Sequence, residues 1–270
     1  MIHPSDTWRF VSSLREELYF EDDLVQHLLL EHRALRRTLT ERVCEDAAAL
    51  AAIRAQMDLA VTCNTPALPR LYMMEEVRGR TCYVMELVEG AAFTVELQDE
   101  RHRHPEGWAR MALRLLDMLL DLRRNGARFG FLKTDHLIVA EGGDLRINQR
   151  WIVGTLSPED TSKSQILSRM ALVNSGGVIV DRRQPEERVE LKAVLDILTH
   201  LAVGSTRHNY EEMRSQSKYP DPMHPSPVEG VDPSIATLLV QVEKSFSGGP
   251  LSSLTSLRQG IDSFLTEALR

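Results

Sequence analysis

Two common residue types are missing from long opening stretches of this 270-residue chain. The first glycine is Gly79, and the first lysine is Lys133. A glycine-rich loop binds phosphates closely because residues without a Cβ atom let backbone N–H groups approach them. The sequence therefore excludes such a loop before residue 79, and it excludes a phosphate-binding lysine before residue 133.

Cysteine, excess basic charge and long apolar runs are also scarce. The three cysteines, Cys44, Cys63 and Cys82, form no CxxC pair, so we expect reduced thiols rather than a disulfide framework. A net charge of −7 argues against general binding to nucleic acid or to anionic membranes. No apolar run approaches the roughly 20 residues of a spanning helix, and the N-terminus lacks the features of a signal peptide. We therefore expect a soluble cytoplasmic protein with no nucleic-acid partner and no membrane insertion.

The segments that are present favour strands in the first third of the chain and helices afterwards. Residues 47–61 have strong helix propensity, with apolar residues spaced three and four apart, and Thr65-Pro66 ends the pattern. Pro105 opens an amphipathic helix that ends at Asn125-Gly126. The other expected elements are strands near residues 28–30, 71–74 and 81–87, a hairpin of residues 137–139 and 145–147, and helices at 186–203, 234–245 and 252–268. This layout predicts an α+β fold with two lobes.

Several short segments share their order and spacing with one known family. Tyr83–Gly90 reads YVMELVEG, and Phe129–Val139 reads FGFLKTDHLIV. Three further matches are Pro185-Glu186, residues 190–204 and the tail from residue 232. Together these segments resemble the eukaryotic-type protein kinase domain in its bacterial Ser/Thr kinase form, with its fifth strand and hinge, catalytic loop, A-P-E motif and buried helix. The resemblance implies a degenerate N-lobe at residues 1–90 and a helical C-lobe at residues 91–270.

The kinase resemblance also implies that the nucleotide-binding lysine is replaced. In this family a lysine on the third strand contacts the phosphates, and a glutamate inside the next helix pairs with it. Arg42 falls in the place of that lysine, and its planar guanidinium does not substitute readily for a point charge. Residues 47–57 contain no acidic residue, so the usual ion pair is not expected.

The catalytic loop and the metal site are altered in the same way. Phe129, Phe131 and His136 stand where the family has His, Asp and Asn. A phenylalanine cannot accept a hydroxyl proton, and Mg²⁺ prefers oxygen ligands to imidazole. Lys133 is retained, whereas Asn148 replaces the metal-binding aspartate and lacks its charge.

These replacements predict a catalytically inactive pseudokinase that acts as a regulatory or scaffolding binding module in signalling. We expect no catalytic residue, no ATP or Mg²⁺ binding and no bound metal, and we expect a protein partner such as an active kinase. Two alternatives stay open at this point: a divergent nucleotide-binding enzyme that uses Asp135 and Asp144, and a structural subunit of a larger assembly.

Three local features each leave two interpretations. His102 and His104 could suggest a metal site, but the arginines that alternate with them favour an exposed loop. Phe129 and Phe131 could plug the vacated active site or could be ordinary core residues. Residues 155–182 are rich in serine and threonine and stand where the family has its activation segment, so this expected loop is either a phosphorylation target or an ordinary polar loop.

Overall fold

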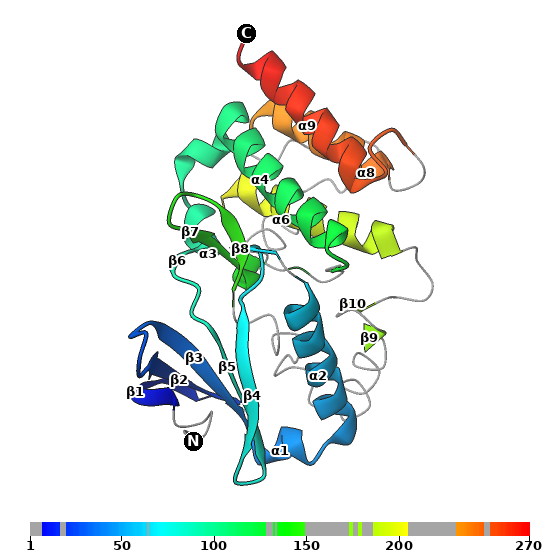
Figure 1. The fold of residues 1–270 in the computed structure, drawn as a ribbon. Helices are drawn as coiled ribbons and strands as arrows, with labels where there is room; N and C mark the ends of the chain where they lie inside the picture. The colour runs from blue at the N-terminus through cyan, green and yellow to red at the C-terminus, as the bar shows by residue number, and fades with distance from the viewer. Residues whose placement is uncertain are drawn as a thin grey trace, which may run out of the picture.

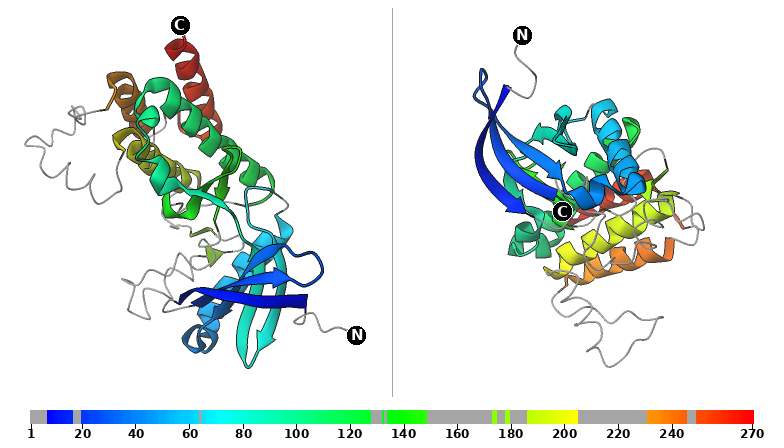
Figure 2. Two further views of the ribbon diagram at one scale, coloured as in Figure 1. Left: turned by 90° about the vertical axis from the view of Figure 1, so that its left-hand side faces the viewer. Right: turned by 90° about the horizontal axis from the view of Figure 1, so that it is seen from below.

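The computed structural model describes residues 7–16, 20–63, 65–127, 132, 134–148, 173–174, 178–179, 186–204, 231–245 and 249–270. A five-stranded sheet occupies one end of the molecule, and a group of helices occupies the other end (Figures 1 and 2). The predicted α+β class is confirmed. Among the helices in these ranges, none is long and apolar enough to cross a membrane.

The five-stranded sheet is antiparallel throughout and takes all its strands from the first third of the chain. The strands in spatial order are β1 (Trp8–Glu16), β2 (Phe20–His27), β3 (Arg33–Leu39), β5 (Arg80–Glu86) and β4 (Leu71–Val77). The crossover from β3 to β4 contains two helices, α1 (Glu41–Cys44) and α2 (Ala47–Thr62). The long helix α2 runs beside the sheet in Figure 1.

The alternation of side chains along β3 explains how the sheet is covered. Leu35 and Leu39 point to the face that shares a core with α2, where Ile53 and Met57 are buried. Ala34, the residue before Leu35, points to the opposite face and packs in a small separate cluster. Because side chains alternate with a period of two, Arg37, midway between Leu35 and Leu39, must also face α2.

The expected strand at residues 28–30 is wrong. Leu28, Leu29 and Leu30 form the turn between β2 and β3, and all three side chains are exposed. The ring nitrogen Nδ1 of His27 accepts hydrogen bonds from the backbone N–H groups of Leu29 and Leu30, which fixes the turn. The three consecutive leucines therefore lie just beyond the end of β2. The sequences of β1 to β3 show no clear alternation of apolar and polar residues that would have predicted strands.

Most of the remaining elements agree with the sequence predictions. The expected loop at residues 155–182 lies outside the described residues, apart from two short strands. The predicted hairpin is β7 (Leu137–Ala140) and β8 (Leu145–Ile147), and β6 (Gly90–Ala92) adds a third strand to it. The predicted helices are α4 (Pro105–Arg124), α6 (Glu186–Val203), α8 (Pro233–Ser245) and α9 (Leu254–Ala268). The short elements are α3 (Phe93–Glu96), the 3₁₀ helices η2 (Glu100–Arg103) and η3 (Thr134–His136), and a small hairpin of β9 (Val173–Asn174) and β10 (Val178–Ile179).

Helix α4 is the centre of the helical end of the molecule. Its apolar stripe is buried, and the indole N–H of Trp108 donates to the carbonyl of Leu198 in α6 at 3.0 Å. Arg123 of α4 pairs with the buried Glu190 of α6 at 2.5 Å. A single cluster of buried side chains continues from Phe20 in the first sheet to Ile261 in α9.

Candidate functional site

The face of the first sheet that looks toward α2 carries a buried ion pair. Arg37 lies in the middle of β3, opposite Asp22 of β2 on one side and Tyr83 of β5 on the other. Its side chain is fully buried, and Nε and Nη2 donate to the two carboxylate oxygens of Asp22 at 2.6 and 2.7 Å. This two-pronged geometry is the strongest form of charge-assisted hydrogen bonding between protein side chains.

Two aromatic residues complete the surroundings of this pair. The guanidinium carbon of Arg37 lies 3.9 Å from the centre of the Phe20 ring, a cation–π contact. Burial raises the pKa of the Tyr83 phenol, so this side chain stays neutral. Burial alone would lower the pKa of Arg37, but its hydrogen bond to Asp22 and the nearby groups outweigh it, and the net shift is upward. Arg37 is therefore charged and is held by side chains of the neighbouring strands.

Asp22 neutralises the charge of Arg37, and this limits the ability of Arg37 to bind an anionic ligand. Burying two charges is costly, and the attraction between them compensates only when geometry is good and further hydrogen bonds are made. Arg37 directs two of its N–H donors at one carboxylate, so that part of its charge is not offered to a ligand. The pair joins β2 to β3 on the face of the sheet that shares a core with α2.

A second ion pair lies where the first sheet meets the three-stranded sheet. Arg146 of β8 donates from Nη1 and Nη2 to the carboxylate oxygens of Glu86, at 2.7 and 2.9 Å. The same guanidinium donates from Nε to the carbonyl of Pro66 at 2.7 Å, in the connection between α2 and β4. The backbone N–H of Ile147 donates to the carbonyl of Ala67 at 2.8 Å. These contacts fix the end of β5 against β8.

Burial and hydrogen bonding act in opposite directions on Glu86. Burial raises the pKa of its carboxyl group. The hydrogen bonds from Arg146 and from the backbone N–H of Arg70 lower this pKa by more, so the net shift is downward. Glu86 is therefore ionised, as a two-pronged ion pair requires.

Arg42 does not lie where the sequence placed it. Strand β3 ends at Leu39, and Arg42 lies on the exposed surface of α1. Helix α1 is at the far end of the first sheet from β7 and β8 (Figure 1). The placement of Arg42 on the third strand is thus wrong, because the strand is shifted toward the N-terminus. The three predicted positions Phe129, Phe131 and Lys133 lie outside the described residues.

The structure does bring His136 and Asn148 together. The backbone N–H of Asn148 donates to the carbonyl of His136 at 2.8 Å, and its side-chain amide donates to the carbonyl of Asp135 at 2.6 Å. His136 is buried at the end of η3, with Nε2 3.9 Å from a carboxylate oxygen of Asp135. The amide of Asn148 is thus engaged in fixing the backbone before β7.

Arg37 and Asp22 are the residues that the sequence analysis missed. The signal was present in the alternation of β3, because Arg37 falls between Leu35 and Leu39 on the apolar face. An arginine at a buried strand position requires a buried partner. Nothing in the sequence shows which acidic residue that partner is, since the pairing depends on the register of β2 against β3.

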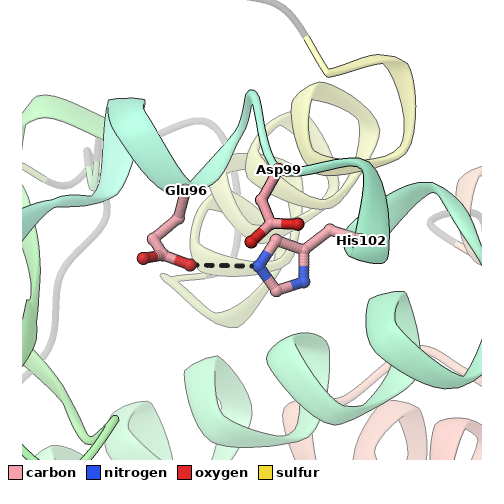
Figure 3. A group of neighbouring side chains, drawn as sticks. All are labelled: Glu96, Asp99 and His102. Carbon is pink, nitrogen blue, oxygen red and sulfur yellow. Dashed lines mark hydrogen bonds and ion pairs between the residues drawn. The ribbon is translucent and has the colours of Figure 1, made fainter.

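A third group of polar side chains lies between α3 and α4. Glu96, Asp99 and His102 each direct one potential ligand atom into the same small region, and these atoms all lie within 4.8 Å of one another (Figure 3). His102 was expected on an exposed loop, and that expectation is wrong, because its ring is buried in η2. Nothing in the sequence indicated that Glu96 and Asp99 lie next to His102.

Comparison with known proteins gives no family for this chain. No protein-family model matches it, and no curated protein matches it.

Proposed function

We propose that the chain is a catalytically inactive protein-kinase-like domain, with a two-lobed fold, that serves as a regulatory or scaffolding binding module. The observation that carries this proposal is the buried Arg37–Asp22 pair on the face of the sheet toward α2. It neutralises a cation in the strand where a kinase needs a lysine that is free to hold phosphates.

The order of the elements supports a kinase-like fold. In the resemblance, the lysine strand is third, a helix follows it, and the fifth strand leads to the hinge. Here β3 is followed by the short helix α1 and then by α2, and Tyr83–Glu86 forms the end of β5, from which the chain continues to the helices. The long helix α4 then precedes the β7–β8 hairpin, as the order of the catalytic loop requires.

The charges near α2 support the absence of phosphoryl transfer. The first turn of α2 has no acidic residue, and the partner of the third-strand cation comes from β2 instead. The carboxylate of Asp22 lies beside Arg37, and it would repel the phosphates that a kinase lysine attracts. The amide nitrogen of Asn148 donates to the carbonyl of Asp135, and its amide oxygen carries no charge, which supports the loss of the metal-binding aspartate.

An exposed apolar turn supports a role in binding another protein. Leu29 and Leu30 are 80% and 68% exposed at the tip of the β2–β3 hairpin, and Phe10 on β1 is also half exposed. Contiguous exposed apolar side chains are unusual on soluble proteins and often mark an interaction surface. We assign partner binding to this hairpin tip.

Thermal unfolding in the presence of nucleotide tests whether the chain has lost nucleotide binding. With 5 mM ATP and 10 mM Mg²⁺ or Mn²⁺, we expect no change in Tm. ATP at a free concentration of 100 times its Kd would add about 2.7 kcal/mol to the free energy of unfolding. This gain would raise Tm by roughly 5 to 10 °C for a chain of this length. An active Ser/Thr kinase in the same assay provides the positive control. A metal-dependent rise of that size would overturn the proposal.

Affinity capture tests the binding role separately. We expect wild-type protein to recover a stoichiometric partner from its own cell extract, and the Leu29→Ser/Leu30→Ser variant to lose it. Val95→Ser is the matched control, because Val95 is an isolated apolar side chain that is 60% exposed on α3. Equal recovery by all three proteins would show that the hairpin tip does not bind the partner.

A further inference from the structure

A stretch of seven residues between α3 and α4 brings together two carboxylates and one imidazole. Glu96 ends α3, Asp99 caps η2, and His102 lies within η2, so the three residues are spaced three apart. The tight turn from α3 into η2 folds all three side chains toward one point (Figure 3). The side chains of Glu96 and Asp99 are about three-quarters buried, and that of His102 is 10% exposed.

The distances between the polar atoms suit a metal ion. Nε2 of His102 lies 3.1 Å from Oε2 of Glu96, and an oxygen of Asp99 completes a group with no separation above 4.8 Å. Ligand atoms bound tetrahedrally at 2.0–2.1 Å from Zn²⁺ stand about 3.4 Å apart. Small rotations of the two carboxylates would therefore close the group around an ion without moving the backbone.

The other nitrogen of His102 provides independent support. Nδ1 lies 3.4 Å from the backbone carbonyl of Gly107, in the first turn of α4. A carbonyl can only accept, so Nδ1 can take part in this contact only as the donor, and Nε2 is the ring nitrogen that faces the carboxylates. A bound cation would take the place of the 3.1 Å contact that Nε2 makes with the carboxylate of Glu96. Metal-binding histidines characteristically donate their second ring N–H to a backbone carbonyl or carboxylate in this way.

The position of Gly107 shows why the histidine is held at this place. A Cβ atom at residue 107 would lie 1.9 Å from the carbonyl oxygen of Arg101, so only glycine allows η2 to approach α4 this closely. The close approach brings the carbonyl of Gly107 within reach of the His102 ring. The orientation of the ring is thus built into the backbone, before any ligand binds.

Arg101 is the competitor for this site. Its backbone N–H and its guanidinium donate to the carboxylate of Asp99 at 2.9 and 2.8 Å. The guanidinium is 80% exposed, so it can leave Asp99 for water at little cost when a cation arrives.

We propose that Glu96, Asp99 and His102 bind one divalent transition-metal ion, of which Zn²⁺ is the best fit. A nitrogen ligand disfavours Mg²⁺ and Ca²⁺, which prefer oxygen donors only. Three protein ligands leave at least one coordination position for water. The ion would join the end of α3 to η2, and through His102 and Gly107 it would fix both against the start of α4. This site is independent of the proposed pseudokinase function.

Titration with Zn²⁺ and with Co²⁺ tests the site in the full chain, purified without a histidine tag. We expect one ion per chain from isothermal titration calorimetry, and visible Co²⁺ bands without the strong near-ultraviolet absorption that thiolate ligands produce. The variants Glu96→Gln, Asp99→Asn and His102→Gln should each weaken binding by about tenfold or more. His104→Gln is the matched control, since His104 lies two residues away and outside the group, and it should bind as wild type does.

Removal of the Arg101 side chain should change the affinity for Zn²⁺ in the opposite direction to the ligand substitutions. Arg101→Ala should tighten Zn²⁺ binding by about two- to fivefold, because the carboxylate of Asp99 no longer has to give up an ion pair. Circular dichroism of each variant checks that the fold is retained. Absence of one-to-one binding in the wild type would overturn the proposal. So would equal loss in His104→Gln, or thiolate absorption that shows binding at the cysteines.

Discussion

At the residue scale, the buried pair of Arg37 and Asp22 shows how strongly a single contact depends on its partner. Both side chains are removed from water, and each is compensated chiefly by the other. Breaking such a pair leaves an uncompensated charge in the interior, whereas replacing both members removes the problem. The two kinds of substitution should therefore have very different effects on stability.

We predict that Arg37→Met lowers the free energy of unfolding by about 3 to 5 kcal/mol. The double variant Arg37→Met/Asp22→Leu should unfold within about 1 kcal/mol of wild type or above it. Urea titration followed by circular dichroism measures all of these. Arg36→Met is the matched control, because Arg36 is the next residue, faces the other side and pairs with Asp23 while partly exposed, so it should cost less than about 1 kcal/mol. A double variant as unstable as Arg37→Met would contradict this account.

A second residue-scale prediction concerns the pH dependence of stability through Glu86. Its folded pKa is lowered below the unfolded value, so its contribution is complete above the unfolded pKa and is lost as the pH falls toward the folded pKa. The wild type should therefore lose more stability between pH 6 and pH 3 than Glu86→Gln does. Urea titrations at a series of pH values check this difference. Parallel curves for the two proteins would show that the ion pair with Arg146 contributes nothing.

At the element scale, strand β6 depends on a residue without a side chain. Gly90 has φ of +151°, and a Cβ atom there would lie 2.2 Å from the carbonyl oxygen of Val139 in β7. Gly79, in the turn between β4 and β5, also has positive φ, but nothing lies within 4 Å of its Cβ direction. Comparing substitutions at the two glycines therefore distinguishes the cost of backbone strain, present at both, from the cost of a steric clash, present only at Gly90.

Gly90→Ala should cost about 2 to 4 kcal/mol, because β7 must move away to admit the methyl group. Gly79→Ala should cost only about 1 kcal/mol, from the left-handed backbone alone. Thermal or urea unfolding of both variants measures the difference. Equal costs would mean that β6 can shift freely from β7.

At the scale of the whole molecule, one core joins the sheet end to the helical end. The cluster of buried side chains includes Leu35 and Met85 from the first sheet together with Leu115 and Leu198 from the helices. Glu86 and Arg146 add a polar connection at the same junction. The two parts thus share apolar contacts instead of meeting across a purely polar boundary.

We predict that the chain unfolds in one cooperative step, since a shared core gives neither part an independent stability. Native-state hydrogen exchange with mass spectrometry should give the same opening free energy for peptides covering β3 and α4. A much lower value for β3 would show that residues 1–90 open as a separate unit. The proposed boundary near residue 90 would then also be a boundary of stability.

The sequence predicted the helices and the later hairpin well because their signals are local. Pro105 at the first position of α4 and the apolar stripe behind it are readable without any knowledge of neighbours. The early strands were harder, because β1 to β3 carry charged residues such as Asp22 and Arg37 on buried faces. Those charges hide the alternation, and they are tolerated only because the strands pair them.

The sequence by itself determined that no glycine-rich loop precedes Gly79 and that no lysine precedes Lys133, because a residue that is absent cannot act. It also determined the long helices, whose periodic pattern is local. Only the tertiary structure decided that Arg37 is the buried cation of the third strand, that Arg42 lies beyond that strand, and that Asp22 is the partner of Arg37. It likewise brought Glu96, Asp99 and His102 together. Such pairings depend on strand register and on a close backbone approach, which no single segment specifies alone.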